Sequence, residues 1–223
     1  MDTVTSTLLA VTKLTNSDVR VTIRDLDGRR VVWAEFEADD QPTPLTSTTA
    51  DQLVAAATAA LAQRMPLVLV LSTSGASIDE GVAALDGWGR VAAALVACSG
   101  IVPTAAIVSG PAVSGPALLL GITDLTVMTE SSYAFVNGPT MVEQFTAVAI
   151  DIEELGGASH HARHTGVATA VVPSREAAVD IVSALLSYLP DHVDGEPPRI
   201  DVDDPSDRRC PEAGELIPSA STG

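Results

Sequence analysis

Two short segments that follow apolar runs are the residues of this sequence most able to do chemistry. Residues 72–75 (Ser-Thr-Ser-Gly) follow the apolar run 66–71, and residues 110–115 (Gly-Pro-Ala-Val-Ser-Gly) follow the run 104–109. Small residues after a strand can leave backbone N–H groups directed at open space, and two such loops can converge on one negatively charged oxygen. Plain tight turns are the alternative interpretation, which stays open at this point.

Other catalytic patterns are weak. Three histidines cluster at His160, His161 and His164, and the first and last could share one face of a helix. Because no cysteine and only distant carboxylates could complete a ligand set, we expect no metal and a hydrogen-bonding structural role for this cluster. Metal binding and a Ser-His-Asp arrangement stay open as minor alternatives. No G-x-S-x-G turn is present, and neither glycine segment matches the phosphate loop G-x-x-x-x-G-K-[ST].

The elements around these loops are predicted to alternate between strands and helices. We expect strands at 66–71, 104–109, 125–128, 134–136 and 167–172, a turn at 110–115, and helices at 79–98, 116–121, 153–164 and 174–189. Gly156-Gly157 should interrupt the third of these helices. This order implies parallel pairing and an α/β fold, with its functional loops at the carboxyl ends of the strands.

The N-terminal part is predicted to differ from this alternation. Two β-branched runs within residues 18–36 flank Asp27-Gly28, which is typical of a hairpin. A helix should follow, capped by Ser47 or Thr48 and running to about Arg64.

Charge and composition exclude several classes of protein. The chain has 223 residues, a formal net charge of -17 and 46% hydrophobic residues, so its acidity must lie on the surface of a folded core. A nucleic acid or an acidic membrane would require clustered lysine and arginine, but Lys13 is the one lysine among twelve basic residues. The apolar tracts are too short to cross a bilayer and no signal-peptide pattern is present, so we expect a cytoplasmic protein with reduced Cys98 and Cys210.

A series of short segments occurs in an order and spacing that together are specific. They are Gly75-Ala76 with Ile78 and Glu80-Gly81, Gly87-Trp88-Gly89, residues 99–103, Gly110-Pro111, Thr123-Asp124, Gly138-Pro139, residues 154–158 with His161, residues 165–168, residues 185–190, and the tail pieces 196–199, 204–209 and 216–218. With these, the sequence from about residue 31 to 218 resembles the N-terminal half of the carboxyltransferase (β) subunit of biotin-dependent acyl-CoA carboxylases, of the propionyl- and acetyl-CoA carboxylase type.

The resemblance implies a fold and a reaction. The fold would be the crotonase-like (ClpP/crotonase) β-β-α superhelix, as one α/β domain over residues 1–190 followed by a polar, extended arm over residues 191–223. The reaction would move a carboxyl group between carboxybiotin and the α-carbon of an acyl thioester. Biotin would be carried on a separate carrier protein, and its ureido group would take the proton, so that no side-chain acid or base is needed.

The resemblance also implies the site. Gly75, Ala76, Ser114 and Gly115 would provide the oxyanion environment for the enolate, and Gly138 with Pro139 would contact substrate, with no metal. The sequence departs from the family pattern near these positions: Ser74 and Ser114 replace glycines, Ser77 replaces an arginine, Pro116 follows the second loop, and Thr-Ala-Val at 146–148 replaces Thr-Gly-Glu. A carrier-bound thioester therefore stands beside acyl-CoA as a substrate.

Family chains are about twice as long and form their active site between the two halves of different protomers. We therefore expect a split enzyme, in which this chain pairs with a C-half carboxyltransferase-like subunit in a larger oligomer. A biotin carboxylase and a biotinyl carrier protein are possible further partners. Two alternatives stay open: a biotin-independent decarboxylase subunit, as in malonate decarboxylase, and a degenerate scaffold subunit that pairs with an active homologue.

Overall fold

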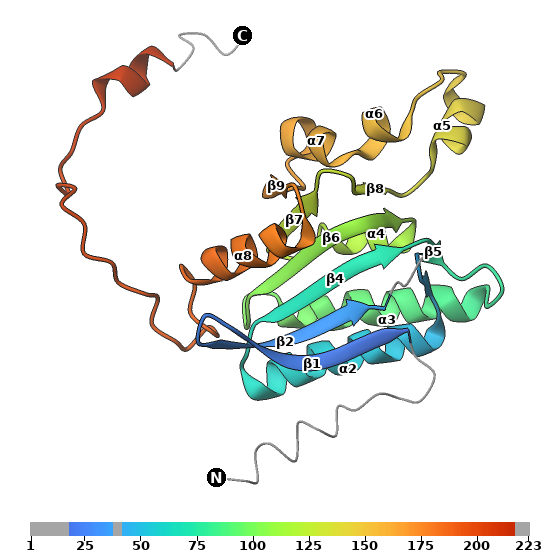
Figure 1. Cartoon of the computed structure of the whole chain (residues 1–223), viewed down its shortest axis with the longest axis horizontal. Coiled ribbons are helices and arrows are strands. Elements are labelled where there is room, and N and C mark those ends of the chain that lie inside the picture. The colour runs from blue at the N-terminus through green and yellow to red at the C-terminus, as the bar shows by residue number, and fades with distance from the viewer. Residues whose placement is uncertain (1–17, 38–41, 217–223) are drawn as a thin grey trace.

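The structure is a computed structural model that describes residues 18–37 and 42–216. A seven-stranded sheet runs in the order β1-β2-β4-β6-β7-β9, and β8 pairs with the end of β6 (Figure 1). The strands are β1 (Val19–Leu26), β2 (Arg29–Phe36), β4 (Leu67–Thr73), β6 (Thr104–Val113), β7 (Leu125–Thr129), β8 (Tyr133–Phe135) and β9 (Ala170–Val172). All pairs in this sheet are parallel except β1 with β2, which confirms the expected α/β class.

Helices cover both faces of the sheet (Figure 1). On one face, α2 (Ser47–Gln63) and α3 (Val82–Cys98) contribute buried side chains to the larger apolar core, including Leu53 and Leu95. On the other face, α8 (Arg175–Leu186) packs Val182 and Leu186 into a second core with Trp33. The shorter elements are β3 (Pro44–Leu45), β5 (Gly75–Ala76), α4 (Gly115–Leu119), α5 (Pro139–Thr146), α6 (Ile152–Gly156), α7 (Ala158–His160), the π-helical turn η1 (His161–Thr165) and the 3-10 turn η2 (Pro211–Glu215).

The N-terminal hairpin is confirmed, but the cap of the first helix is shifted from its predicted position. Asp27 and Gly28 form the turn with φ values of 53° and 85°, which suit the right-handed twist of the strands. The N-cap of α2 is Thr46, not Ser47 or Thr48. Thr46 is the cap because it forms a reciprocal capping box with Thr49. The Thr49 N–H donates to the Thr46 hydroxyl at 3.1 Å, and the Thr46 N–H donates to the Thr49 hydroxyl at 2.7 Å.

The expected turn at 110–115 is largely wrong. β6 continues through residues 111–113, which pair in parallel with residues 133–135 of β8. Glycine and proline suggest a break in the local sequence, but a strand from farther along the chain provides backbone partners for this stretch. The chain leaves the strand direction only at Ser114, immediately before α4.

The arm after residue 190 is anchored where it starts and extended beyond. Asp191 pairs with Arg29 at 3.3 Å, and the Val193 N–H donates to the Ile101 carbonyl at 2.8 Å. From about residue 196 the arm runs away from the body of the molecule (Figure 1), and Ile200 is exposed. Within the described ranges, no helix combines the length and apolarity needed to span a bilayer.

Candidate functional site

The two predicted loops meet at the carboxyl ends of neighbouring strands. β4 and β6 pair in parallel, so β5 after β4 and α4 after β6 lie at the same edge of the sheet (Figure 1). A Cβ on Gly75 would lie 3.1 Å from the Val113 carbonyl oxygen and 3.2 Å from the Cβ of Ser114. Gly75 also has a φ of 106°, which side chains disfavour. Glycine at this position therefore allows the loops to approach closely.

Short backbone contacts hold the first loop in place. β3 pairs in parallel with β5, and the Ser77 N–H donates to the Leu45 carbonyl at 2.8 Å. The Gly75 N–H donates to the hydroxyl of Thr73 at 3.2 Å. Ala76 is the second residue of β5 and is partly exposed. The first loop is thus a short strand, and the Gly75 N–H is already used within it.

The second loop leaves one backbone N–H available. The N–H of Ser114 donates to the Phe135 carbonyl at 2.9 Å, so the predicted use of this group for an oxyanion is not supported in this conformation. Gly115 is the first residue of α4, and its N–H has no acceptor among the described residues. Since Gly115 is also partly exposed, its N–H is the available donor beside the meeting point of the loops.

Trp88 of α3 supports Gly115 and was not predicted as a site residue. Its Nε1–H donates to the Gly115 carbonyl at 2.8 Å. A Cβ on Gly115 would lie 2.7 Å from Cδ1 of Trp88, so the ring packs directly against the Gly115 backbone. The Gly87-Trp88-Gly89 triplet was the available sequence signal, but its contact with α4 depends on tertiary packing.

The predicted substrate-contacting pair belongs to the next element along the chain. Gly138 is the N-cap of α5 and Pro139 its first residue. A Cβ on Gly138 would lie 3.6 Å from the ring of Phe135, whose carbonyl accepts the Ser114 N–H. The pair is therefore linked to the second loop through Phe135, although no direct contact between Gly138 and Gly75 or Gly115 is described.

The histidine cluster has local hydrogen-bonding roles. Nε2 of His161 lies 2.8 Å from the Ala134 carbonyl, and its Nδ1 lies 2.8 Å from the Thr165 hydroxyl. These contacts connect η1 to β8, which agrees with the structural role expected. The rings of His160 and His164 are 5.0 Å apart. Among the residues described, no three or more His, Cys, Asp or Glu side chains are grouped to hold a metal ion.

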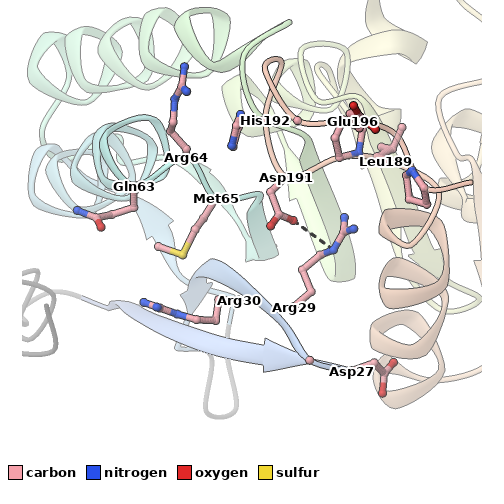
Figure 2. A pocket seen from close by; sticks show the side chains of 14 residues that line it. Asp27, Arg29, Arg30, Gln63, Arg64, Met65, Leu189, Asp191, His192 and Glu196 are labelled. Carbon is pink, nitrogen blue, oxygen red and sulfur yellow. Dashed lines mark ion pairs between the residues drawn. The ribbon is translucent and has the colours of Figure 1, made fainter. Parts of the chain in front are cut away.

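A large open hollow lies at a different place, where the arm begins (Figure 2). Its volume is about 880 Å³, and its lining includes Arg29, Arg30, Arg64 and Asp191. The Arg29–Asp191 ion pair crosses it, and Arg29 also donates to the Leu186 carbonyl. Arg64 is paired with Asp194. Because Arg29 and Arg64 are both paired with aspartates of the arm, we interpret the hollow as the anchor of the arm.

Comparison with known proteins gives the family. Residues 12–223 match the carboxyl transferase domain model. The propionyl-CoA carboxylase carboxyltransferase subunit of Haloferax mediterranei is 30% identical over 208 residues, which are 93% of this chain and 40% of that protein. The chain thus spans well under half the length of that relative.

Solved structures agree with the sequence comparison. A transcarboxylase 12S structure with hydrolysed methylmalonyl-coenzyme A superposes with a TM-score of 0.77 at 28% identity, covering 84% of this chain and 37% of that one. A chain of the Pseudomonas malonate decarboxylase hetero-dimer shares the fold, with a TM-score of 0.68 at 22% identity over 95% of this chain and 91% of that one. The fold is crotonase-like, as expected, and this chain belongs to the carboxyl transferase domain family, matching the N-terminal half of its carboxyltransferases.

Proposed function

We propose that this chain is the N-half subunit of a carboxyltransferase that moves a carboxyl group between carboxybiotin and the α-carbon of an acyl thioester. Residues 1–190 would form the catalytic domain and residues 191–223 an arm. The observation that carries the proposal is the meeting of the two loops, with the available N–H of Gly115 beside Gly75. Because relatives are named propionyl-CoA carboxylases, propionyl-CoA is the first substrate to test.

The residues of the site fit this chemistry. Carboxybiotin on a separate carrier protein would supply the carboxyl group and would take up the proton released from the α-carbon. As that proton leaves, negative charge develops on the thioester oxygen, and the Gly115 N–H is placed to donate to it. Ala76 is the proposed second backbone donor. The absent side chain at Gly75 lets the two loops lie against each other, because a Cβ there would lie 3.1 Å from the Val113 carbonyl oxygen.

Stabilisation by backbone donors explains why no acid or base is required at the loops. One oxyanion donor is worth about 3 to 4 kcal/mol of the activation barrier, and positioning two reactants supplies several more. The loop residues Gly75, Ala76, Ser114 and Gly115 carry no ionisable side chains. Phosphates of CoA would therefore need cations from elsewhere, and a carrier-bound thioester remains a second substrate form.

A C-half carboxyltransferase-like subunit is the proposed partner that completes the site. Exposed apolar side chains follow the first loop: Ile78 is 94% exposed and Val82 is 82% exposed after β5. α5 has no buried residue, and its Met141 and Phe145, four residues apart, are 45% and 83% exposed. Apolar side chains exposed in this way are typical of a protein interface. A biotin carboxylase and a biotinyl carrier protein would complete the enzyme.

The test is reconstitution with a C-half-type subunit, followed by transfer of labelled carboxylate from carboxybiotin to propionyl-CoA. Gly115→Pro and Gly115→Ala form a matched pair, because both add a Cβ against Trp88 but only proline removes the N–H. Loss of one oxyanion donor should make Gly115→Pro about 100-fold slower than Gly115→Ala. Equal rates for the two variants would exclude the Gly115 N–H from the reaction.

Biotin-independent decarboxylation is the second candidate. The observation in its favour is the shared fold over nearly all of a chain from the malonate decarboxylase hetero-dimer. The same stabilised enolate would form when a malonyl-type thioester loses carbon dioxide. Decarboxylation of malonyl-CoA by the reconstituted pair in the absence of carboxybiotin would favour this reaction. A stable complex with neither carboxyl transfer nor decarboxylation would favour a scaffold role for this chain.

A further inference from the structure

Ser114 holds a backbone conformation that normally requires glycine. Its φ and ψ are 63° and -133°, a region in which the Cβ of an ordinary residue is strained. The same chain uses glycine at the comparable position before α3, where Gly81 has φ 53° and ψ -117°. Residues in such conformations persist only where the surrounding structure imposes them, and they concentrate at functional sites.

No hydrogen bond within the described residues explains why a side chain is kept there. The Ser114 hydroxyl makes no hydrogen bond to any residue that the structure describes. Its oxygen is also absent from the buried polar atoms without a partner, which in the described ranges are those of Thr22, Thr129 and His192. The hydroxyl is therefore accessible to solvent rather than sealed in the core.

The position of this side chain points to its use. The Cβ of Ser114 lies 3.2 Å from where a Cβ of Gly75 would be, so it occupies the junction of the two loops. Gly115, whose N–H has no acceptor among the described residues, is the next residue. A hydroxyl and an N–H on consecutive residues can donate to the same oxygen, or to two oxygens of one group.

We infer that the side-chain hydroxyl of Ser114 is a substrate-contacting donor, which joins the Gly115 N–H in binding the carbonyl oxygen of an acyl thioester. This inference rests on the proposed function for the identity of the ligand. The Ser114 N–H is used by Phe135, so the residue acts through its side chain and not through its backbone. The strained backbone is retained because glycine would remove the hydroxyl.

Two substitutions separate the hydroxyl from the strain. Ser114→Ala removes the hydroxyl and keeps the Cβ, whereas Ser114→Gly removes both. In the chain alone, Ser114→Gly should raise Tm by about 2 to 4 °C, and Ser114→Ala should leave it within about 1 °C. In the complex with the C-half-type subunit, both variants should weaken propionyl-CoA binding about fivefold and lower kcat/KM for transfer about tenfold.

Each outcome decides the inference. Unchanged propionyl-CoA binding and transfer in Ser114→Ala would overturn it, as would a wild-type complex that does not bind propionyl-CoA. A wild-type complex that binds propionyl-CoA but transfers no carboxylate would refute the proposed reaction alone. In that case, weaker propionyl-CoA binding by both Ser114 variants than by wild type would still support the hydroxyl contact. Propionyl-CoA binding equal to that of wild type would exclude it.

Discussion

Glu35 is a buried carboxylate that connects the β1–β2 hairpin to α8, and replacing it by glutamine should destabilise the chain. Its side chain accepts hydrogen bonds from Arg24 at 2.9 Å, from Nε1 of Trp33 at 2.9 Å, and from Arg175. The guanidinium of Arg24 also lies 4.2 Å from the ring centroid of Trp33. One carboxylate thus satisfies three donors from three elements.

The size of the effect follows from burial and screening. The Glu35 side chain is 7% exposed, while those of Arg24 and Arg175 are 38% and 40% exposed. Hydrogen bonds to charged groups contribute about 1.5 to 3 kcal/mol each, and glutamine would present an NH₂ group to at least one donor. Because water screens both arginines, we expect the free energy of unfolding to fall by about 3 kcal/mol. This value is at the low end of the range for breaking a buried ion pair. This corresponds to a Tm lower by about 6 to 12 °C.

Urea unfolding of the full chain, followed by tryptophan fluorescence, measures this loss. Glu37→Gln is the matched control, because Glu37 pairs with Arg20 at 3.1 Å on the surface, with side chains 33% and 52% exposed. An exposed pair contributes about 0 to 1 kcal/mol, so this control should unfold close to wild type. If Glu35→Gln and Glu37→Gln unfold at the same urea concentration, the buried network does not stabilise the fold as reasoned.

The same network predicts a dependence on pH. Burial alone would raise the pKa of Glu35, but hydrogen bonds from Arg175 and Trp33 and the charges of both arginines outweigh it and lower the pKa below its ordinary value of 4.5. A carboxylate with a lowered folded-state pKa stabilises the fold above the unfolded-state value and loses this effect as pH falls through the folded-state value. The difference in the free energy of unfolding between wild type and Glu35→Gln should therefore become smaller below about pH 4.

Three further changes test the site and its surroundings. Trp88→Phe keeps a ring beside Gly115 but removes the 2.8 Å hydrogen bond, so transfer by the reconstituted complex should slow about tenfold; an unchanged rate would show that this bond does not position Gly115. Burial raises the pKa of the Cys98 thiol to about 11, so a thiol reagent at pH 8 should label Cys210 in the folded chain and Cys98 only in urea; rapid labelling of both would contradict the burial. Phe145→Asp should weaken binding of the C-half-type subunit about tenfold or more in calorimetry while leaving the Tm of the isolated chain unchanged, and undiminished binding would remove α5 from the interface.

Most of the fold follows from local patterns. The continuous apolar runs predicted the buried strands β4 and β6, and Asp27-Gly28 predicted the hairpin. Ser174 was correctly predicted to begin a helix, and it caps α8 by accepting the Ala177 N–H at 3.2 Å. These features depend on side-chain periodicity and on residues within about four positions, so a single sequence is enough to predict them.

Other features depend on partners that are remote in the chain. The strand at residues 111–113 exists because β8 lies beside it, and no local signal in its Gly-Pro start predicts that pairing. The contact of Trp88 with Gly115 joins residues 27 positions apart. The Ser114 N–H donates to the carbonyl of Phe135, 21 positions later, whereas the family resemblance implied that this N–H was available to an oxyanion.

The sequence by itself determined the α/β class, the family resemblance and the two loops able to carry the chemistry. Only the tertiary structure decided which groups in those loops are available. It brought Gly75 within contact of Ser114, left the Gly115 N–H without an acceptor among the described residues, and used the Ser114 N–H elsewhere. The physical reason is that a residue type defines which donors exist, whereas a hydrogen bond requires a partner at about 3 Å, and folding alone decides which partner arrives there.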